Sequence, residues 1–145
     1  MTDLIHENGE VKGVIASQNN ETIKIKANKG VILASGGFEK NQTLREKYLP
    51  KPTDKAWSAA NIHNTGDAIS ATEDLNVALH QMDAGWWTTT MNIPGHEKGW
   101  LSIVDKSVPG NYTVNKNGHR FSNESQNYVS FVTDMFDEYE KGNPC

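Results

Sequence analysis

Gly30-Val31-Ile32-Leu33-Ala34-Ser35-Gly36-Gly37 is a short apolar run that ends in small residues and glycine. An apolar run of this length between glycines is typical of a strand that is buried on both faces, as in a parallel sheet. The small residues at its end leave the backbone open to the close approach of another group. The sequence therefore predicts a sheet strand whose end forms a binding surface.

The residues before this segment predict a small antiparallel meander over 3–28. Asn8-Gly9 is a strong signal for a two-residue hairpin, because both residue types tolerate positive φ. Asn19-Asn20 predicts a second turn. Beyond it, Ile23 and Ile25 alternate with lysines at the period of a half-buried strand.

The residues after the segment are richer in helical pattern. Apolar spacing and helix-ending prolines or glycines predict three helices, over 39–49, 68–78 and 128–139. Weaker signals predict a short strand at 79–83 and a hairpin that pairs 112–115 with 119–121 around Asn117-Gly118. Little regular pattern is expected over 85–109. The fold class is therefore α+β.

Composition excludes several classes of function. The 145 residues carry a net charge of −4 without a long basic run, so nucleic acid is not an expected partner. No apolar run approaches the roughly 18 residues that a membrane span requires. No signal peptide is visible and Cys145 is the single cysteine, which predicts a cytoplasmic location. The five histidines form no pair at ligand spacing, so no metal site is expected.

Four sequence blocks, in order, resemble the flavoprotein family that includes succinate dehydrogenase, fumarate reductase and the 3-ketosteroid dehydrogenases. The resemblance implies that FAD is the cofactor of the whole protein. The blocks cover nearly the whole chain, and they are Gly30 to Phe38, Asn64-Thr65-Gly66-Asp67-Ala68-Ile69, Met82-Asp83-Ala84-Gly85-Trp86-Trp87, and Val114 to Ser125 with its Asn-x-x-Gly-x-Arg-Phe core.

In that family the first block reaches the FAD with its glycine-rich end, and an acidic residue of the second block contacts the flavin end of the cofactor. Asp67 matches that residue, and Thr65 is expected to cap the following helix. Thr and Asp before a helix are also ordinary caps, so both interpretations remain open. The resemblance implies these cofactor-binding residues: Ala34, Ser35, Gly36, Gly37, Thr65, Gly66 and Asp67.

The third and fourth blocks separate the subfamilies. Fumarate reductases place a His-Pro-Thr where this chain has Trp86 and Trp87, and two indoles suit a large apolar substrate better than a dianion. Their proton-donating Arg falls at Tyr128 here. An Arg does not readily give up its proton, whereas a Tyr beside a cation or flavin can. Core packing of these aromatic residues is the alternative that the residues alone leave open.

The resemblance implies removal of two hydrogens from adjacent carbons beside a ketone, as in the 3-ketosteroid dehydrogenases. Tyr128 would be the base, and Trp86 and Trp87 would line the pocket for a steroid-like or other apolar ketone. A fumarate reductase or succinate dehydrogenase type of flavoprotein is the alternative within the same class. A free-standing α+β binding module is the alternative outside it.

The chain is expected to be an internal piece of such an enzyme, with 1–37 from the FAD-binding domain and 38–145 from the substrate-capping domain. It contains no Gly-x-Gly-x-x-Gly, the motif that grips a dinucleotide pyrophosphate. The piece alone is therefore expected to be inactive, to bind FAD weakly or not at all, and to self-associate through exposed apolar surface.

Overall fold

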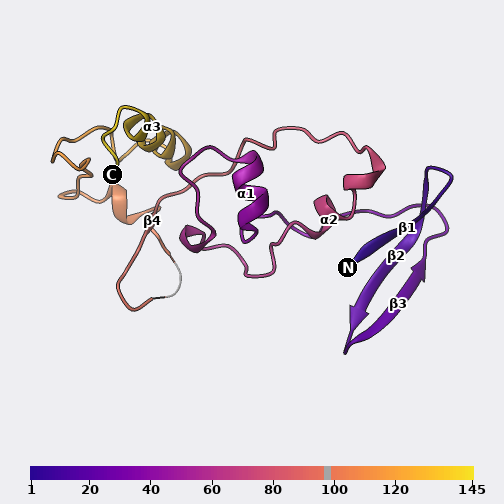
Figure 1. The fold of residues 1–145 in the computed structure, drawn as a ribbon. Coiled ribbons are helices and arrows are strands. Elements are labelled where there is room, and N and C mark those ends of the chain that lie inside the picture. The colour runs from indigo at the N-terminus through magenta and orange to yellow at the C-terminus, as the bar shows by residue number, and fades with distance from the viewer. Residues whose placement is uncertain (97–98) are drawn as a thin grey trace. The chain divides into compact units, whose positions relative to one another are not determined.

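The computed structural model describes residues 1–96 and 99–145 (Figure 1). Within this part of the chain the residues group into two compact units. Unit 1 comprises Met1–Asn41 and Asn61–His80, and unit 2 comprises Gln42–Ala60 and Gln81–Cys145. The mixture of short antiparallel sheets with a few helices confirms the α+β class.

Unit 1 begins with the predicted meander. Strands β1 (Asp3–Glu7), β2 (Glu10–Gln18) and β3 (Glu21–Lys26) pair antiparallel in that order (Figure 1). Asn8 and Gly9 take φ of 52° and 80°, the left-handed values that a tight hairpin turn requires. A Cβ on Gly13 would lie 2.1 Å from the Ile25 carbonyl oxygen, so only glycine lets β2 and β3 approach here.

The apolar segment 30–34 differs from its prediction. It forms no strand in this structure, and Ile32 is 93% exposed. A strand that is buried on both faces needs a neighbouring strand on each side. The three strands of unit 1 pair with one another and leave no partner for this segment.

The helix predicted over 68–78 is much shorter than expected. It consists of α2 (Asp67–Ser70) and a 3-10 turn, η2 (Glu73–Leu75). The Thr72 hydroxyl donates to the Ala68 and Ile69 carbonyl oxygens, and a threonine bonded to the preceding turn competes with helix propagation. Asn76 then takes φ of 50° and ends the element. The strand predicted at 79–83 is wrong, because these residues are irregular.

Unit 2 contains the two helices that the sequence predicts best. The first, α1 (Gln42–Tyr48), buries Leu44, and the short 3-10 helix η1 (Lys55–Trp57) follows. The second, α3 (Tyr128–Glu140), carries Phe131, which is 1% exposed and lies at the centre of the core. The Phe121 and Phe131 rings are 5.7 Å apart, so the last block of the sequence packs on α3.

The middle of unit 2 is as irregular as the sequence indicates. Its regular elements are the two-residue strands β4 (Thr90–Met91) and β5 (Trp100–Leu101) and the 3-10 turn η3 (Asp105–Ser107). The hairpin predicted around Asn117-Gly118 is present as a single antiparallel bridge, Val114 to Arg120.

Candidate functional site

Unit 1 brings together the two blocks that the sequence assigns to the cofactor. The Gly66 N–H donates to the Gly37 carbonyl oxygen at 3.0 Å, and the Asn41 side-chain amide donates to the Thr65 carbonyl oxygen at 2.9 Å. The Lys40 N–H donates to the Asn64 carbonyl oxygen at 3.0 Å. The glycine-rich end of the first block and the turn before α2 therefore adjoin through three hydrogen bonds.

This junction requires glycine at particular positions. Gly36 has φ of 82°, and a Cβ there would lie 2.7 Å from the Asn64 side-chain oxygen. Gly66 has φ of 80° and is buried. Residues with a Cβ rarely adopt this left-handed region, so both glycines are needed for the backbone path.

Thr65 and Asp67 are hydrogen-bonded to each other. The Thr65 hydroxyl donates to an Asp67 carboxylate oxygen at 2.5 Å. The capping role expected for Thr65 is wrong, because Gly66 is the N-cap of α2 and no side chain caps that end. The hydrogen bond instead orients the carboxylate of the half-buried Asp67, which can accept further hydrogen bonds.

These residues fit one part of a dinucleotide cofactor. Ala34, Ser35 and Gly36 are exposed and small, so a flat ring or a ribose can lie against their backbone. Asp67 offers an acceptor for a hydroxyl or ring N–H of a ligand. The pyrophosphate grip is not among the residues of this chain, as the missing glycine motif requires.

Unit 2 brings together two of the three residues that the sequence assigns to substrate and catalysis. The Trp86 indole N–H donates to the Tyr128 phenol oxygen at 2.6 Å, across 42 positions of the sequence. Tyr128 is the first residue of α3 and is half-buried, whereas Trp86 is 83% exposed. An exposed indole beside a phenol forms an amphipathic surface that suits an apolar ring bearing a polar group.

Trp87 has a different environment. Its ring packs edge-on against Phe136 of α3, with centroids 5.7 Å apart and planes at 70°. A Cβ on Gly85 would lie 2.9 Å from the Trp87 ring, so this glycine makes room for the indole. Trp87 is therefore half-buried and anchors the segment to α3, which matches the core-packing alternative for this residue.

Sequence reasoning missed Lys106, which holds the turn before Tyr128. Its ammonium group donates to the carbonyl oxygens of Glu124 at 2.5 Å and Gln126 at 2.8 Å, and the residue is 7% exposed. The Asn127 side chain then caps α3 by accepting from the Ser130 N–H. The sequence around a single lysine in an irregular segment does not predict these hydrogen bonds.

A buried carboxylate holds the fourth block together. Glu124 is 4% exposed and pairs with Arg120 at 2.5 Å. The hydrogen bonds from Arg120 lower the pKa of Glu124 to about 2, against the opposing effect of burial and with help from the Thr113 N–H. Asn115, also buried, donates to Glu138 and lowers the pKa of that carboxyl group. Polar residues of this block thus serve the fold of unit 2.

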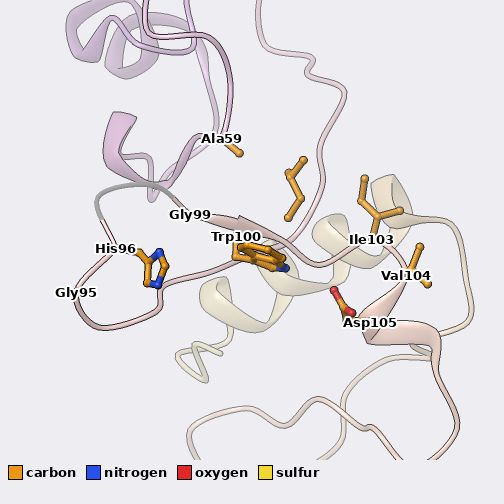
Figure 2. A pocket seen from close by; sticks show the side chains of 9 residues that line it. Ala59, Gly95, His96, Gly99, Trp100, Ile103, Val104 and Asp105 are labelled. Carbon is orange, nitrogen blue, oxygen red and sulfur yellow. The ribbon is translucent and has the colours of Figure 1, made fainter.

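Unit 2 also has an open hollow of about 890 Å³ (Figure 2). The Trp100 indole and the His96 imidazole lie on it, and Asp105 is among its few polar groups. The hollow shares no residue with the Trp86–Tyr128 pair, so it is not the predicted site. Its lining residues are Ala59, Gly95, His96, Gly99, Trp100, Leu101, Ile103, Val104 and Asp105.

The described residues contain neither a metal-binding cluster nor a membrane-spanning helix. No group of three or more His, Cys, Asp or Glu side chains in 1–96 and 99–145 is arranged to hold a metal ion. Over the same residues, no helix has both the length and the apolar character that crossing a membrane would require.

Comparisons with known proteins agree with this geometry. Residues 1–144 match a family model described as an FAD binding domain. The 3-oxosteroid 1-dehydrogenase of Mycobacterium tuberculosis is 41% identical over 140 residues, which are 93% of this chain and 24% of that protein. The chain therefore spans about a quarter of the length of the curated relatives it matches.

A solved structure gives the same result. The 3-ketosteroid delta1-dehydrogenase of Sterolibacterium denitrificans, in complex with 1,4-androstadiene-3,17-dione, matches with a TM-score of 0.91 and 38% identity, over 98% of this chain and 26% of that one. A probable fumarate reductase of Shewanella frigidimarina is only 25% identical over 121 residues. Similarity thus favours the steroid enzymes over the fumarate alternative, and a free-standing module is not supported.

Proposed function

This chain belongs to the FAD binding domain family, and from that premise we propose that the whole protein dehydrogenates a carbon–carbon bond beside the ketone of a steroid-like substrate. The observation that carries the proposal is the hydrogen bond between the exposed indole of Trp86 and the phenol of Tyr128. It joins an apolar surface to a proton-accepting oxygen, as the reaction requires.

The proposed chemistry begins at the carbon next to the ketone, whose carbonyl group acidifies the neighbouring C–H. Tyr128, as phenolate, takes that proton on its phenol oxygen. Trp86 borders the substrate and keeps water from its apolar rings, and Trp87, packed on Phe136, holds this segment against α3. When bound, FAD supplies the acceptor for the hydride that leaves the adjacent carbon.

The cofactor residues of unit 1 have positioning roles in this proposal. The backbone of Ala34–Gly37 would hold the cofactor from one side, and the Asp67 carboxylate would accept a hydrogen bond from it. The buried Gly66, through its bond to Gly37, fixes the distance between these two contacts. Thr65 orients the carboxylate.

The proposal extends to the arrangement of the whole protein. Residues 1–37, with the meander and the glycine-rich end, would belong to the FAD-binding domain, and 38–145 to the substrate-capping domain. The protein is proposed to act in the cytoplasm. The single cysteine, Cys145, cannot form a disulfide within these residues, which agrees with a reducing compartment.

Activity of the whole protein tests the proposal. With a 3-ketosteroid and an artificial electron acceptor, we expect turnover and a new ring double bond in the product, detected by ultraviolet absorbance and mass spectrometry. With fumarate and a reduced electron donor, we expect none. Fumarate reduction without steroid turnover would replace the proposal by its alternative.

Tyr128→Phe in the whole protein tests the proposed base. The substitution keeps the ring and removes the oxygen, so we expect kcat to fall by about 10²-fold or more, the usual contribution of a general base. Flavin content should not change. Tyr112→Phe, which removes the oxygen of a 70% exposed tyrosine, is the matched control and should leave kcat unaltered. Near-normal turnover by Tyr128→Phe would remove Tyr128 from the mechanism.

A further inference from the structure

We propose that Trp86 is a positioning residue that fixes the phenol oxygen of Tyr128 through its indole N–H, beyond any part it has in lining the substrate. This inference rests on the proposed function, because it concerns the residue proposed as the base. It is carried by the 2.6 Å distance between the Trp86 indole nitrogen and the Tyr128 oxygen.

The backbone of Tyr128 is held from several sides already. Lys106 donates to the carbonyl oxygens of Glu124 and Gln126, which lie four and two residues before it. The Gln126 side-chain amide donates to Asp134 at 2.6 Å, and Asn127 caps the helix that Tyr128 begins. These contacts fix where α3 starts, but none of them acts on the phenol oxygen.

The Trp86 N–H acts on that oxygen directly. An indole nitrogen can donate and cannot accept, so the phenol oxygen must be the acceptor and its own hydrogen must point elsewhere. The contact therefore selects one rotation of the phenol O–H and leaves one side of the oxygen for the substrate. Trp86 therefore acts by holding the phenol oxygen in one place.

The position of Trp86 is itself fixed. The adjacent Trp87 packs edge-on against Phe136, two turns further along α3, and Gly85 leaves space for that ring. The segment is thus attached to the same helix at two places, by packing at Trp87 and by a hydrogen bond at Trp86. Because packing of Trp87 on α3 holds the neighbouring Trp86, the Trp86 N–H stays close to the Tyr128 oxygen at the start of the same helix.

The test is a double-mutant cycle on the whole protein, with rates expressed per bound flavin. Trp86→Phe keeps an aromatic ring and removes the N–H, so kcat should fall roughly tenfold to a hundredfold while KM changes less than about threefold. In a Tyr128→Phe background the same change should have almost no further effect on the rate of single-turnover flavin reduction. Trp57→Phe, which removes an indole N–H in η1, is the control and should leave kcat unchanged.

The outcomes separate the role of Tyr128 as base from the role of Trp86 as positioning residue. If Tyr128→Phe reduces turnover strongly and Trp86→Phe reduces it less than about twofold, the positioning role is wrong and the proposed base stands. If Trp86→Phe slows both backgrounds by the same factor, its effect does not pass through Tyr128 and the inference is overturned. If Tyr128→Phe turns over normally, the proposed mechanism is wrong, and the role of Trp86 is overturned with it.

Discussion

At the scale of the residue, the Arg120–Glu124 pair makes the stability of unit 2 depend on pH. Glu124 is almost fully buried, whereas the Arg120 side chain is 58% exposed. Because the pKa of Glu124 is about 2 in the folded chain, against an ordinary 4.5, the folded state binds this proton less readily than the unfolded state does. The stabilisation is fully present above about pH 4.5 and is lost as the pH falls toward 2.

Glu124→Gln tests this in the whole protein. At pH 7 the variant should melt at a lower temperature than the parent, since Gln keeps an acceptor for the Thr113 N–H but loses the charge that pairs with Arg120. The difference should shrink as the pH is lowered from about 4.5 toward 2. Glu140→Gln, at an exposed glutamate in the last turn of α3, is the control. A difference that is independent of pH would contradict the assignment.

At the scale of the element, the start of α3 depends on a lysine from a distant segment. Lys106→Met keeps an apolar stem and removes the donors to the Glu124 and Gln126 carbonyl oxygens. The Ser107 hydroxyl still donates to the Glu124 carbonyl oxygen, whereas the carbonyl oxygen of the half-buried Gln126 loses its lysine donor. Losing that bond should cost about 1–3 kcal/mol in the free energy of unfolding, which chemical denaturation of the whole protein measures. Lys116→Met, at an exposed lysine, should cost much less. If the two variants lose the same free energy of unfolding, the Lys106 hydrogen bonds do not stabilise the start of α3.

The elements that the sequence predicts well are those whose signals are local. The meander follows from Asn8-Gly9 and from alternation, and α3 follows from its apolar period and the Asn127 cap. The strand expected at 30–34 depends on neighbouring strands, and no strand among residues 1–96 and 99–145 pairs with it. The helix from 68 stops early because of a threonine side chain bonded to its own backbone.

The candidate site shows the same division. The family resemblance assigned the Gly30–Phe38 and Asn64–Ile69 blocks to one cofactor, and the structure joins them by the hydrogen bond from the Gly66 N–H to the Gly37 carbonyl oxygen. The Trp86–Tyr128 hydrogen bond joins residues that are 42 positions apart in the sequence. The hydrogen bonds from Lys106 reach residues that are 18 and 20 positions away. No short pattern encodes such a separation, so these contacts required the structure.

At the scale of the whole molecule, the proposed cofactor-binding and substrate-binding residues fall in different compact units. The residues proposed to bind the cofactor lie in unit 1, and the Trp86–Tyr128 pair lies in unit 2. The proposed reaction needs both, together with a pyrophosphate grip that these 145 residues do not contain. The chain therefore holds part of a site, and we expect function only from the longer protein.

The isolated chain provides the test. We expect purified material to be colourless, with no flavin absorbance near stoichiometry and no steroid turnover, and to sediment as more than a monomer. We expect exposed apolar side chains to cause this association; among those that the structure describes, the most exposed are Ile32, Trp86, Val104 and Tyr112. Stoichiometric yellow protein would show that the pyrophosphate grip is dispensable, and a monodisperse monomer would contradict the association.

The two Asn-Gly turns of the chain, at Asn8 and Asn117, differ in how readily the asparagine can deamidate. Asn117 is tied down, since its side-chain amide donates to Asn143 and its backbone N–H donates to Asn115. Asn8 lies at an exposed hairpin tip, and the space around the following Gly9 is as open as that around Gly118, so the hydrogen bonds of Asn117 make the difference. Cyclisation onto the next amide nitrogen, which leads to deamidation and isoaspartate, is thus easiest at Asn8. Deamidation at Asn8 would add a negative charge between Glu7 and Glu10, so we expect this modification to appear first at the tip of the first hairpin.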